Sequence, residues 1–222
     1  MQRSIGVWVV VVLGAWCLRP QGAEAVILIN EVLADPSALS GDANGDGIIH
    51  TTQDEFLELV NTGSDPVSLA SWTLWDLTGI RHAFPLTSSI PSLGFFVVFG
   101  GGSPAGFANV SVASTGTLGL NNTGDTLTLR DASATIIDVL AYGAEGGMDV
   151  SLTRSPDATG PFIQHASLGS SFSPGTTVDG LDHLPWASNE PVVPEPTSMA
   201  LLGLGLCGLP LIRRRAGHLD NI

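Results

Sequence analysis

The chain has 222 residues, of which 21 are acidic and eight are basic, and its formal net charge is −13. All eight basic residues are arginines, and three of them lie between residues 26 and 193, where 18 acidic residues leave a balance of −15. Such an acidic body repels nucleic acid and attracts cations, so we expect no nucleic-acid partner. Cys17 and Cys207 lie towards the two ends, and we therefore expect no disulfide within the body.

The first 25 residues have the pattern of an export signal. Arg3 precedes the apolar run "IGVWVVVVLGAW", and Ala23 and Ala25 have the small-residue spacing of a signal-peptidase site. We predict that residues 1–25 are a signal peptide. A short structural helix at the N-terminus is the alternative interpretation.

Residues 26–180 consist of short apolar stretches separated by turns rich in Gly, Pro, Asn and Asp, without sustained helical periodicity. This pattern predicts an all-β fold, an antiparallel β-sandwich, with Trp72, Trp75, Phe84, Phe95 and Phe96 in or near its core. The loop-rich stretch that begins at Pro156 is expected to lie across the sandwich edge. The predicted strands are Val26–Ala34, Glu55–Asn61, Val67–Asp76, Arg81–Leu86, Gly94–Gly100, Asp125–Asp131, Thr135–Gly143 and Ser151–Arg154.

One loop, residues 42–54, has the spacing of a calcium site. Asp42, Asn44 and Asp46 occupy its first, third and fifth positions, Gly47 follows for the sharp turn, and the Ile48 carbonyl comes seventh. This resembles the calcium loops of EF-hands and dockerins, except that the twelfth position lacks an acid, and a one-residue bulge would let Asp54 complete the site. We predict one bound calcium ion. The alternative is an acidic turn whose side chains bind only nearby backbone amides.

The body offers no obvious catalytic set. Glu55 and Glu58 lie three apart on a predicted strand, so they face opposite sides of the sheet and cannot easily share a substrate. The serine-rich stretch "SLGSSFSPG" has no base that its spacing would assign, and a flexible loop is the simpler interpretation. The four histidines of the body lie in separate segments: His50, His82, His165 and His183.

After a predicted linker at residues 181–193, the chain ends in a sorting tail at 194–215. Pro194, Glu195 and Pro196 precede an apolar run, residues 197–212, and Arg213, Arg214 and Arg215 follow it. At about 1.5 Å per residue the run reaches roughly 24 Å, so it crosses a bilayer core only with local thinning or snorkelling arginines. The arginines are expected to stay cytoplasmic and the body outside that membrane.

This tail resembles the PEP-CTERM sorting signal of exopolysaccharide-producing bacteria. The resemblance implies that an exosortase-type enzyme recognises and processes the tail, which is then a transient membrane anchor. The mature protein would reach the cell surface or the extracellular matrix. A permanent membrane anchor is the alternative.

The body resembles the lamin tail domain family. The resemblance rests on the order of "INEVLADP", "DEFLELVNTGSDPVSLASWTLWD", "GFFVVFG", "DTLTLRD", "IIDVLAYG", "SLTRSPDATG" and "FSPGTTVDG". It implies an immunoglobulin-like sandwich that serves as a non-catalytic attachment or interaction module, with extracellular polysaccharide or other surface proteins as possible partners. Two alternatives remain open: a secreted, metal-assisted hydrolase of polysaccharide or phosphoester, and a carbohydrate-binding module that uses exposed Trp residues or Tyr142.

Overall fold

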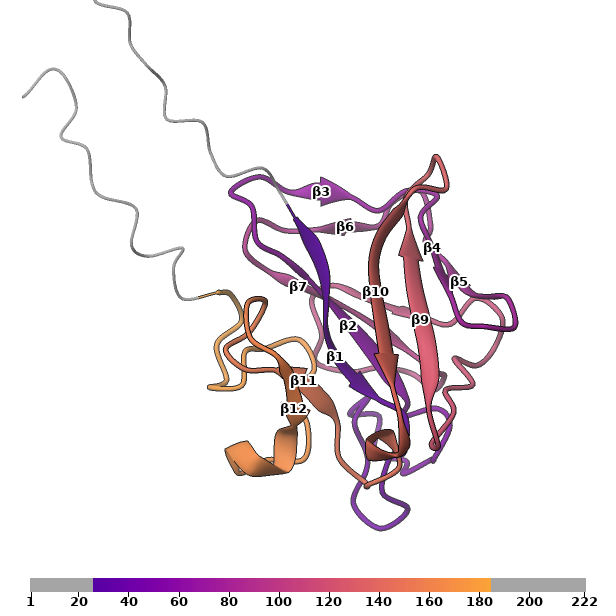
Figure 1. Cartoon of the computed structure of the whole chain (residues 1–222), viewed down its shortest axis with the longest axis vertical. Coiled ribbons are helices and arrows are strands. Elements are labelled where there is room, and N and C mark those ends of the chain that lie inside the picture. Colours follow the sequence, from indigo (N-terminus) through magenta and orange to yellow (C-terminus); the bar gives the residue numbers. More distant parts are fainter. Residues whose placement is uncertain (1–25, 185–222) are drawn as a thin grey trace, which may run out of the picture. The chain divides into compact units, whose positions relative to one another are not determined.

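The computed structural model describes residues 26–184, which form twelve β-strands and two short 3-10 helices (Figure 1). The strands are β1 (Ile27–Leu33), β2 (Phe56–Asn61), β3 (Val67–Ser68), β4 (Thr73–Trp75), β5 (Ile80–Ala83), β6 (Ser89–Ile90), β7 (Phe95–Phe99), β8 (Val110–Val112), β9 (Asp125–Arg130), β10 (Ile136–Tyr142), β11 (Leu152–Arg154) and β12 (Phe162–Gln164). The 3-10 helices are η1 (Ala144–Gly146) and η2 (His165–Leu168).

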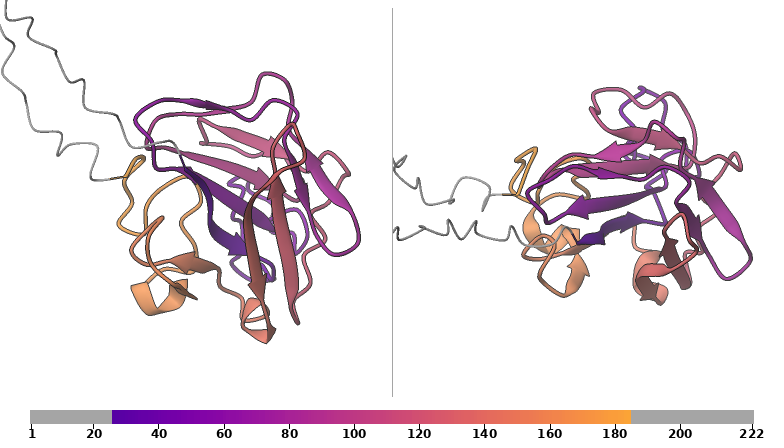
Figure 2. Two further views of the ribbon diagram at one scale, coloured as in Figure 1. Left: turned by 45° about the horizontal axis from the view of Figure 1, so that its top comes forward. Right: turned by 90° about the horizontal axis from the view of Figure 1, so that it is seen from above.

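Two larger sheets make up the sandwich. One has six strands in the order β12-β11-β1-β2-β7-β8, the other has four in the order β10-β9-β4-β5, and β3 pairs with β6 separately. The two larger sheets lie face to face (Figure 2). The prediction of an all-β sandwich is therefore confirmed for this part of the chain, with one parallel pair, β7 and β8, among antiparallel neighbours.

The predicted strand Val67–Asp76 is wrong as a single element. Ser71 has φ of 62°, and the Trp72 amide donates to the Leu69 carbonyl at 3.0 Å, so the chain turns between β3 and β4. The two halves then join different sheets. Strands β6, β8 and β12 were not predicted, because two or three residues are too few for alternation to be recognised.

The core between the sheets follows the alternation of each strand. Leu127 and Leu129 of β9 point inwards and are fully buried, while Thr126 and Thr128 face outwards. Phe84 and Phe96 pack edge to face in this core, with ring centroids 5.6 Å apart. Trp72 packs against the core from a partly buried position.

Two aromatic residues predicted for this core lie elsewhere. Phe95 packs with Val60 in a separate cluster on the other side of the six-stranded sheet. Trp75 lies on the outer face of the four-stranded sheet, because Leu74 takes the inward position beside it. Alternation along so short a strand cannot be assigned to a face from sequence alone.

Side chains close the sandwich where β1 approaches β10. The Ile29 amide donates to Asp138 Oδ2 at 2.8 Å, and Arg154 Nε donates to the Ile29 carbonyl at 2.9 Å. Ile29 precedes a β-bulge in the pairing of β1 with β2, and β11 begins to pair with β1 only at Glu31. The two charged side chains therefore satisfy backbone groups that no strand reaches.

Strand β2 is buried on both faces. Leu57 and Leu59 face the sandwich core, whereas Phe56 and Val60 belong to clusters on the opposite side. Leu184, predicted to lie in the linker, is fully buried against Val60, and its amide donates to the Leu93 carbonyl at 2.8 Å. The packed body therefore continues through Leu184.

Asn30 joins two buried carboxyl groups on this covered face. Its Nδ2 donates to Glu58 Oε1 at 2.9 Å and to Asp157 Oδ1 at 3.0 Å, and its Oδ1 accepts from the Ala158 amide at 2.8 Å. The Gly175 amide donates to Glu58 Oε2 at 2.6 Å. Burial raises the pKa of Glu58 well above its usual range, and the charge of the facing Glu31 raises it further.

A second buried network surrounds Glu31. Its carboxyl accepts from the Ser151 hydroxyl and from the Ser173 amide at 3.0 Å, and Ser173 Oγ lies 2.9 Å from its Oε2. His165 Nε2 lies 2.8 Å from Ser173 Oγ, and its Nδ1 lies 3.0 Å from the Ser170 carbonyl. Because a carbonyl only accepts, Nδ1 carries a proton. Burial raises the pKa of Glu31, although the hydrogen bonds from Ser151 and Ser173 and the charge of His165 oppose it.

The donors in both networks lie within residues 26–184, as do the three hydrophobic clusters. Strands β11 and β12 and the loops after them extend the six-stranded sheet beyond β1 and cover its back. Within residues 26–184, both buried carboxyl groups therefore have hydrogen-bond donors, and the three hydrophobic clusters belong to one packed body.

The protonation of Glu31 leads to a test by Glu31→Gln. Glutamine keeps a side-chain oxygen that accepts from the Ser151 hydroxyl and the Ser173 amide, and it does not ionise. Because the folded state keeps this proton above the unfolded pKa, the stabilisation is complete below about pH 4.5 and is lost as the pH rises through the folded pKa. Thermal unfolding between pH 5 and 8 should show a smaller loss of stability for the variant than for the natural body.

The matched control is Glu145→Gln. Glu145 is exposed in η1, and its pKa is lowered by the hydrogen bond from the Gly143 amide, so its loss should leave the slope above pH 5 unchanged. A Glu31→Gln variant that melts far below the natural body at pH 7, with its slope intact, would instead show that the fold favours the ionised carboxylate of Glu31.

Candidate functional site

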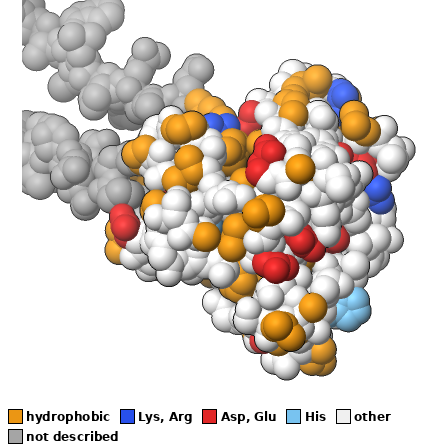
Figure 3. Space-filling model, turned by 60° about the horizontal axis from the view of Figure 1, so that its bottom comes forward, with side chains coloured by type: hydrophobic (Ala, Val, Ile, Leu, Met, Phe, Trp, Pro, Cys, Tyr) orange, Lys and Arg blue, Asp and Glu red, His pale blue; other side chains and the backbone are white. Residues whose placement is uncertain are grey.

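The acidic loop, residues 42–54, connects β1 to β2 at the lower end of the sandwich in Figure 1. Asp42 Oδ2 accepts from the Gly47 amide at 3.1 Å, Asn44 Oδ1 from the Asp46 amide at 2.9 Å, and Asp46 Oδ1 from the Ile48 amide at 2.9 Å. These three bonds wind the loop tightly. Figure 3 brings this end forward and shows acidic and hydrophobic side chains interspersed on it.

Asp54 holds the two halves of the loop together. It is fully buried, and its Oδ1 accepts from the Asn44 amide at 3.0 Å while its Oδ2 accepts from the His50 amide at 2.7 Å. Both carboxylate oxygens are thus engaged by backbone donors. Asp54 organises the loop in the way that an Asx-type turn does, at longer range.

The loop is also fastened to the turn that follows β7. The Ser103 amide donates to Asp46 Oδ2 at 3.0 Å, and the Ala105 amide donates to the Asn44 carbonyl at 2.9 Å. Gly102 has φ of 76°, and a Cβ there would lie 2.4 Å from Asn44 Nδ2. Glycine is therefore required at this position by both conformation and space.

The fit of this loop to a cation is partial. Asp42 Oδ1 is buried without a hydrogen-bond partner, which leaves one carboxylate oxygen available to an ion. However, no three Asp, Glu, His or Cys side chains of residues 26–184 come together in a way that could hold a metal. A calcium ion would have to draw on Asn44 and the Ile48 carbonyl as well, and the calcium site stays a prediction.

Glu55 and Glu58 are separated by the sheet, as predicted from their spacing. Glu55 Oε2 accepts from the Leu120 amide at 3.2 Å, whereas Glu58 binds Asn30 and Gly175 on the covered face. Burial raises the pKa of Glu55 to about 7, against hydrogen bonds from Leu120 and Gly119 that lower it. These two carboxyl groups form no catalytic pair.

Sequence reasoning missed the contact among Ser173, His165 and Glu31. The serine belongs to the stretch interpreted as a flexible loop, yet it lies within hydrogen-bond distance of an imidazole and a carboxyl group. No spacing signal could have shown this, because Glu31 and Ser173 are 142 positions apart. Both His165 and Glu31 are fully buried, so the arrangement has a structural role and offers no access to a substrate.

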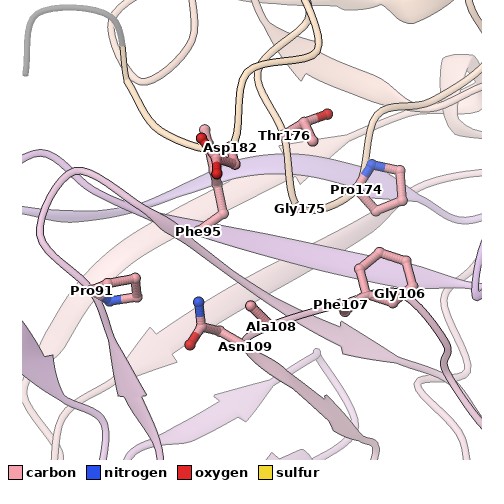
Figure 4. Close-up of a pocket in the computed structure, with 10 residues that line it drawn as sticks. All are labelled: Pro91, Phe95, Gly106, Phe107, Ala108, Asn109, Pro174, Gly175, Thr176 and Asp182. Atoms are coloured by element: carbon pink, nitrogen blue, oxygen red, sulfur yellow. The ribbon is translucent and has the colours of Figure 1, made fainter. Parts of the chain in front are cut away.

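A pocket of about 430 Å³ lies next to this network (Figure 4). Its wall includes Phe95 and Phe107, and Asp182 is its only charged residue. Pro174 and Gly175 line it, but Ser173 does not. The pocket can accept a small uncharged group, and it contains no pairing of a nucleophile with a base.

Residues 26–184 do not provide the aromatic surface that a carbohydrate-binding module needs. Tyr142 is only 7% exposed, and Trp72 packs against the core. Trp75 is partly buried beneath the guanidinium of Arg130, which lies 5.6 Å from the ring centroid. All large hydrophobic side chains that are well exposed within residues 26–184 are aliphatic or methionine.

The residues of the sorting tail, Pro194 to Pro196 and Arg213 to Arg215, lie outside the described residues, as do the signal peptide and the apolar run. Within residues 26–184, no helix has the length and apolar character needed to span a membrane.

Comparison with protein families identifies two parts of the chain. Residues 192–216 match the PEP-CTERM protein-sorting motif. Residues 20–144 match the Lamin Tail Domain, and this range includes β1 to β10, the strands that form the two faces of the core. Comparison with curated proteins finds no match. Because the matched range covers more than half of the chain and its strands form the expected sandwich, the chain belongs to the lamin tail domain family.

Proposed function

We propose that this protein is an exported, non-catalytic module of the cell surface or extracellular matrix, delivered there by exosortase-type processing of its tail. The observation that carries the proposal is the PEP-CTERM match at residues 192–216, with "PEP", an apolar run and three arginines in succession. The export signal predicted at the other end of the chain supports the same route. In this proposal the apolar run anchors the protein in the membrane until it is processed.

Two structural observations and the family match support a non-catalytic body. The serine, histidine and glutamate that meet near β1 are engaged with one another, and the imidazole and carboxyl groups are buried. The one carboxylate that lines the neighbouring pocket, Asp182, lies 2.6 Å from Nδ1 of the exposed His183. Lamin tail domains are immunoglobulin-like modules, which agrees with a role in attachment or interaction.

The rival function is a metal-assisted hydrolase that uses the acidic loop. Such a site needs an open metal position and a nearby base. His50 is the histidine within the loop, and its Nδ1 lies 3.1 Å from Thr52 Oγ1 and accepts from the Gln53 amide at 3.3 Å. The imidazole therefore takes part in the local turn, which favours the non-catalytic proposal.

We assign calcium, as part of this proposal, a structural role in the acidic loop. The free Oδ1 of Asp42 supports an ion there, with Asn44, Asp46, the Ile48 carbonyl and Asp54 as the remaining predicted ligands or organisers. A connection between β1 and β2 of this length costs entropy to order, and an ion that binds only the folded loop offsets part of that cost.

The tail prediction concerns the mature C-terminus. Because the proposed processing removes the apolar run and arginines, mass spectrometry of protein recovered from the cell surface should find a C-terminus near Pro194 to Pro196. Replacing Pro194, Glu195 and Pro196 by alanine should leave the chain unprocessed in the membrane fraction. Mature surface protein that still carries Arg215 would contradict the proposal.

The absence of catalysis is tested on the purified body. Esters, phosphodiesters and polysaccharides should be converted only at background rates, with and without added calcium. Turnover that depends on Asp46, shown by its loss in Asp46→Ala, would establish the hydrolase instead.

Calcium binding is tested by thermal unfolding in calcium and in chelator. At a calcium concentration 100 times the dissociation constant, a site present only in the folded state should add about 2.7 kcal/mol to the free energy of unfolding. An incomplete ligand set predicts a dissociation constant of ~10⁻⁴ to 10⁻³ M, as for extracellular modules. Asp42→Ala should abolish the increment, and Asp65→Ala, an exposed acid outside the loop, should keep it. Identical melting of the natural body in both conditions would show that the loop is an acidic turn.

A further inference from the structure

The outer face of the four-stranded sheet carries no acidic side chain, although the body around it has a balance of −15. The strand pairing places Ile80, Trp75, Thr128 and Val139 in one row across β5, β4, β9 and β10. The next row is Ala83, Thr73, Arg130 and Ile136, and Thr126 with Ala141 begins a third. We call these ten residues the outer face.

Arg130 is the charged residue at the middle of the outer face. The other arginines of residues 26–184 have carboxylate partners, Asp76 for Arg81 and Asp138 for Arg154 at 3.8 Å, but Arg130 has none. Its guanidinium lies over Trp75, and its Nη1 donates to the Ala134 carbonyl at 3.3 Å. These contacts hold Arg130 in place, and its positive charge has no carboxylate partner within residues 26–184.

Aliphatic side chains surround this arginine and tryptophan. Ile80, Ile136 and Val139 are between 41% and 52% exposed, and the threonines add short hydroxyl groups. Tryptophan and arginine are enriched at the centres of protein–protein interfaces, and here they lie at the centre of an apolar patch. A polysaccharide would instead need open aromatic rings, and the one indole here is covered by Arg130.

The acidic loop offers the complementary surface. Leu39 just before it is 89% exposed and Ile48 within it is 62% exposed, and they flank Asp42 and Asp46. The loop thus presents negative charge among exposed aliphatic side chains. The outer face presents one positive charge, that of Arg130, in similar apolar surroundings. The loop has three carboxylates, Asp42, Asp46 and Asp54, so a bound divalent cation would leave it with a net charge of −1.

We propose that the outer face of one copy binds the acidic loop of a second copy. The two surfaces are different parts of the molecule, one a sheet face and the other a loop at the sandwich end, so the contact is heterologous. Repeating it adds copies in one direction and builds an open chain or a closed ring. The protein would then assemble with itself outside the cell. This self-assembly goes beyond the proposed function, which is export to the cell surface or matrix as a non-catalytic module.

Sedimentation velocity on residues 26–184 tests the contact over a range of concentrations. The natural body should show a mass that rises with concentration. Arg130→Glu and Val139→Asp, on the outer face, and Ile48→Asp, on the loop, should each stay monomeric at every concentration. Leu86→Asp changes an exposed leucine outside both surfaces and should associate as the natural body does.

Mixing two variants then distinguishes the heterologous contact from other arrangements. Arg130→Glu retains a natural loop and Ile48→Asp retains a natural outer face, so an equal mixture should form two-copy species and nothing larger. A natural body that stays monomeric throughout would overturn the proposal, as would a mixture that remains monomeric while the natural body associates. Unchanged melting temperatures of the variants ensure that loss of association is not loss of folding.

Discussion

Two glutamates that face each other across β1 and β2 must be removed from water for the rest of this fold to form. Glu31 and Glu58 are fully buried, and burial of an ionised carboxylate without partners costs several kcal/mol. The protein meets this cost with hydrogen-bond donors from Ser151, Ser173 and Gly175 and with protonation that burial favours. The C-terminal segment is held against the six-stranded sheet because it supplies these donors.

This constraint makes the two sheets unequal. The middle of the six-stranded sheet, strands β2 and β7, is buried on both sides, with the core on one side and two smaller hydrophobic clusters on the other. The four-stranded sheet has one covered side and one open side, and its strand β9 shows clean alternation for that reason. Within residues 26–184, the four-stranded sheet therefore presents an outer face to solvent, with Trp75 and Arg130 at its middle.

The acidic loop is ordered by hydrogen bonds to its own side chains. Its Asp and Asn residues bind backbone amides, and the turn with Gly102 fixes it to the neighbouring connection. The loop is consequently ordered by protein contacts before any ion is considered. Calcium would add to an existing arrangement, and this agrees with a stabilising role and not with a sensing one.

Sequence alone determined the all-β class, most strand positions, the acidic character and the motif at the C-terminus, because alternation, turn residues and short linear motifs are local signals. Only the tertiary structure decided which face of β4 Trp75 occupies and that Leu184 belongs to the body. It also decided that Ser173, His165 and Glu31 meet. These outcomes depend on segments far apart in the chain that pack together, and the pairing of Glu31 with Ser173 has no trace in local spacing. The same holds for the free oxygen of Asp42, because the partners of each loop carboxylate are set by how the whole loop winds and docks.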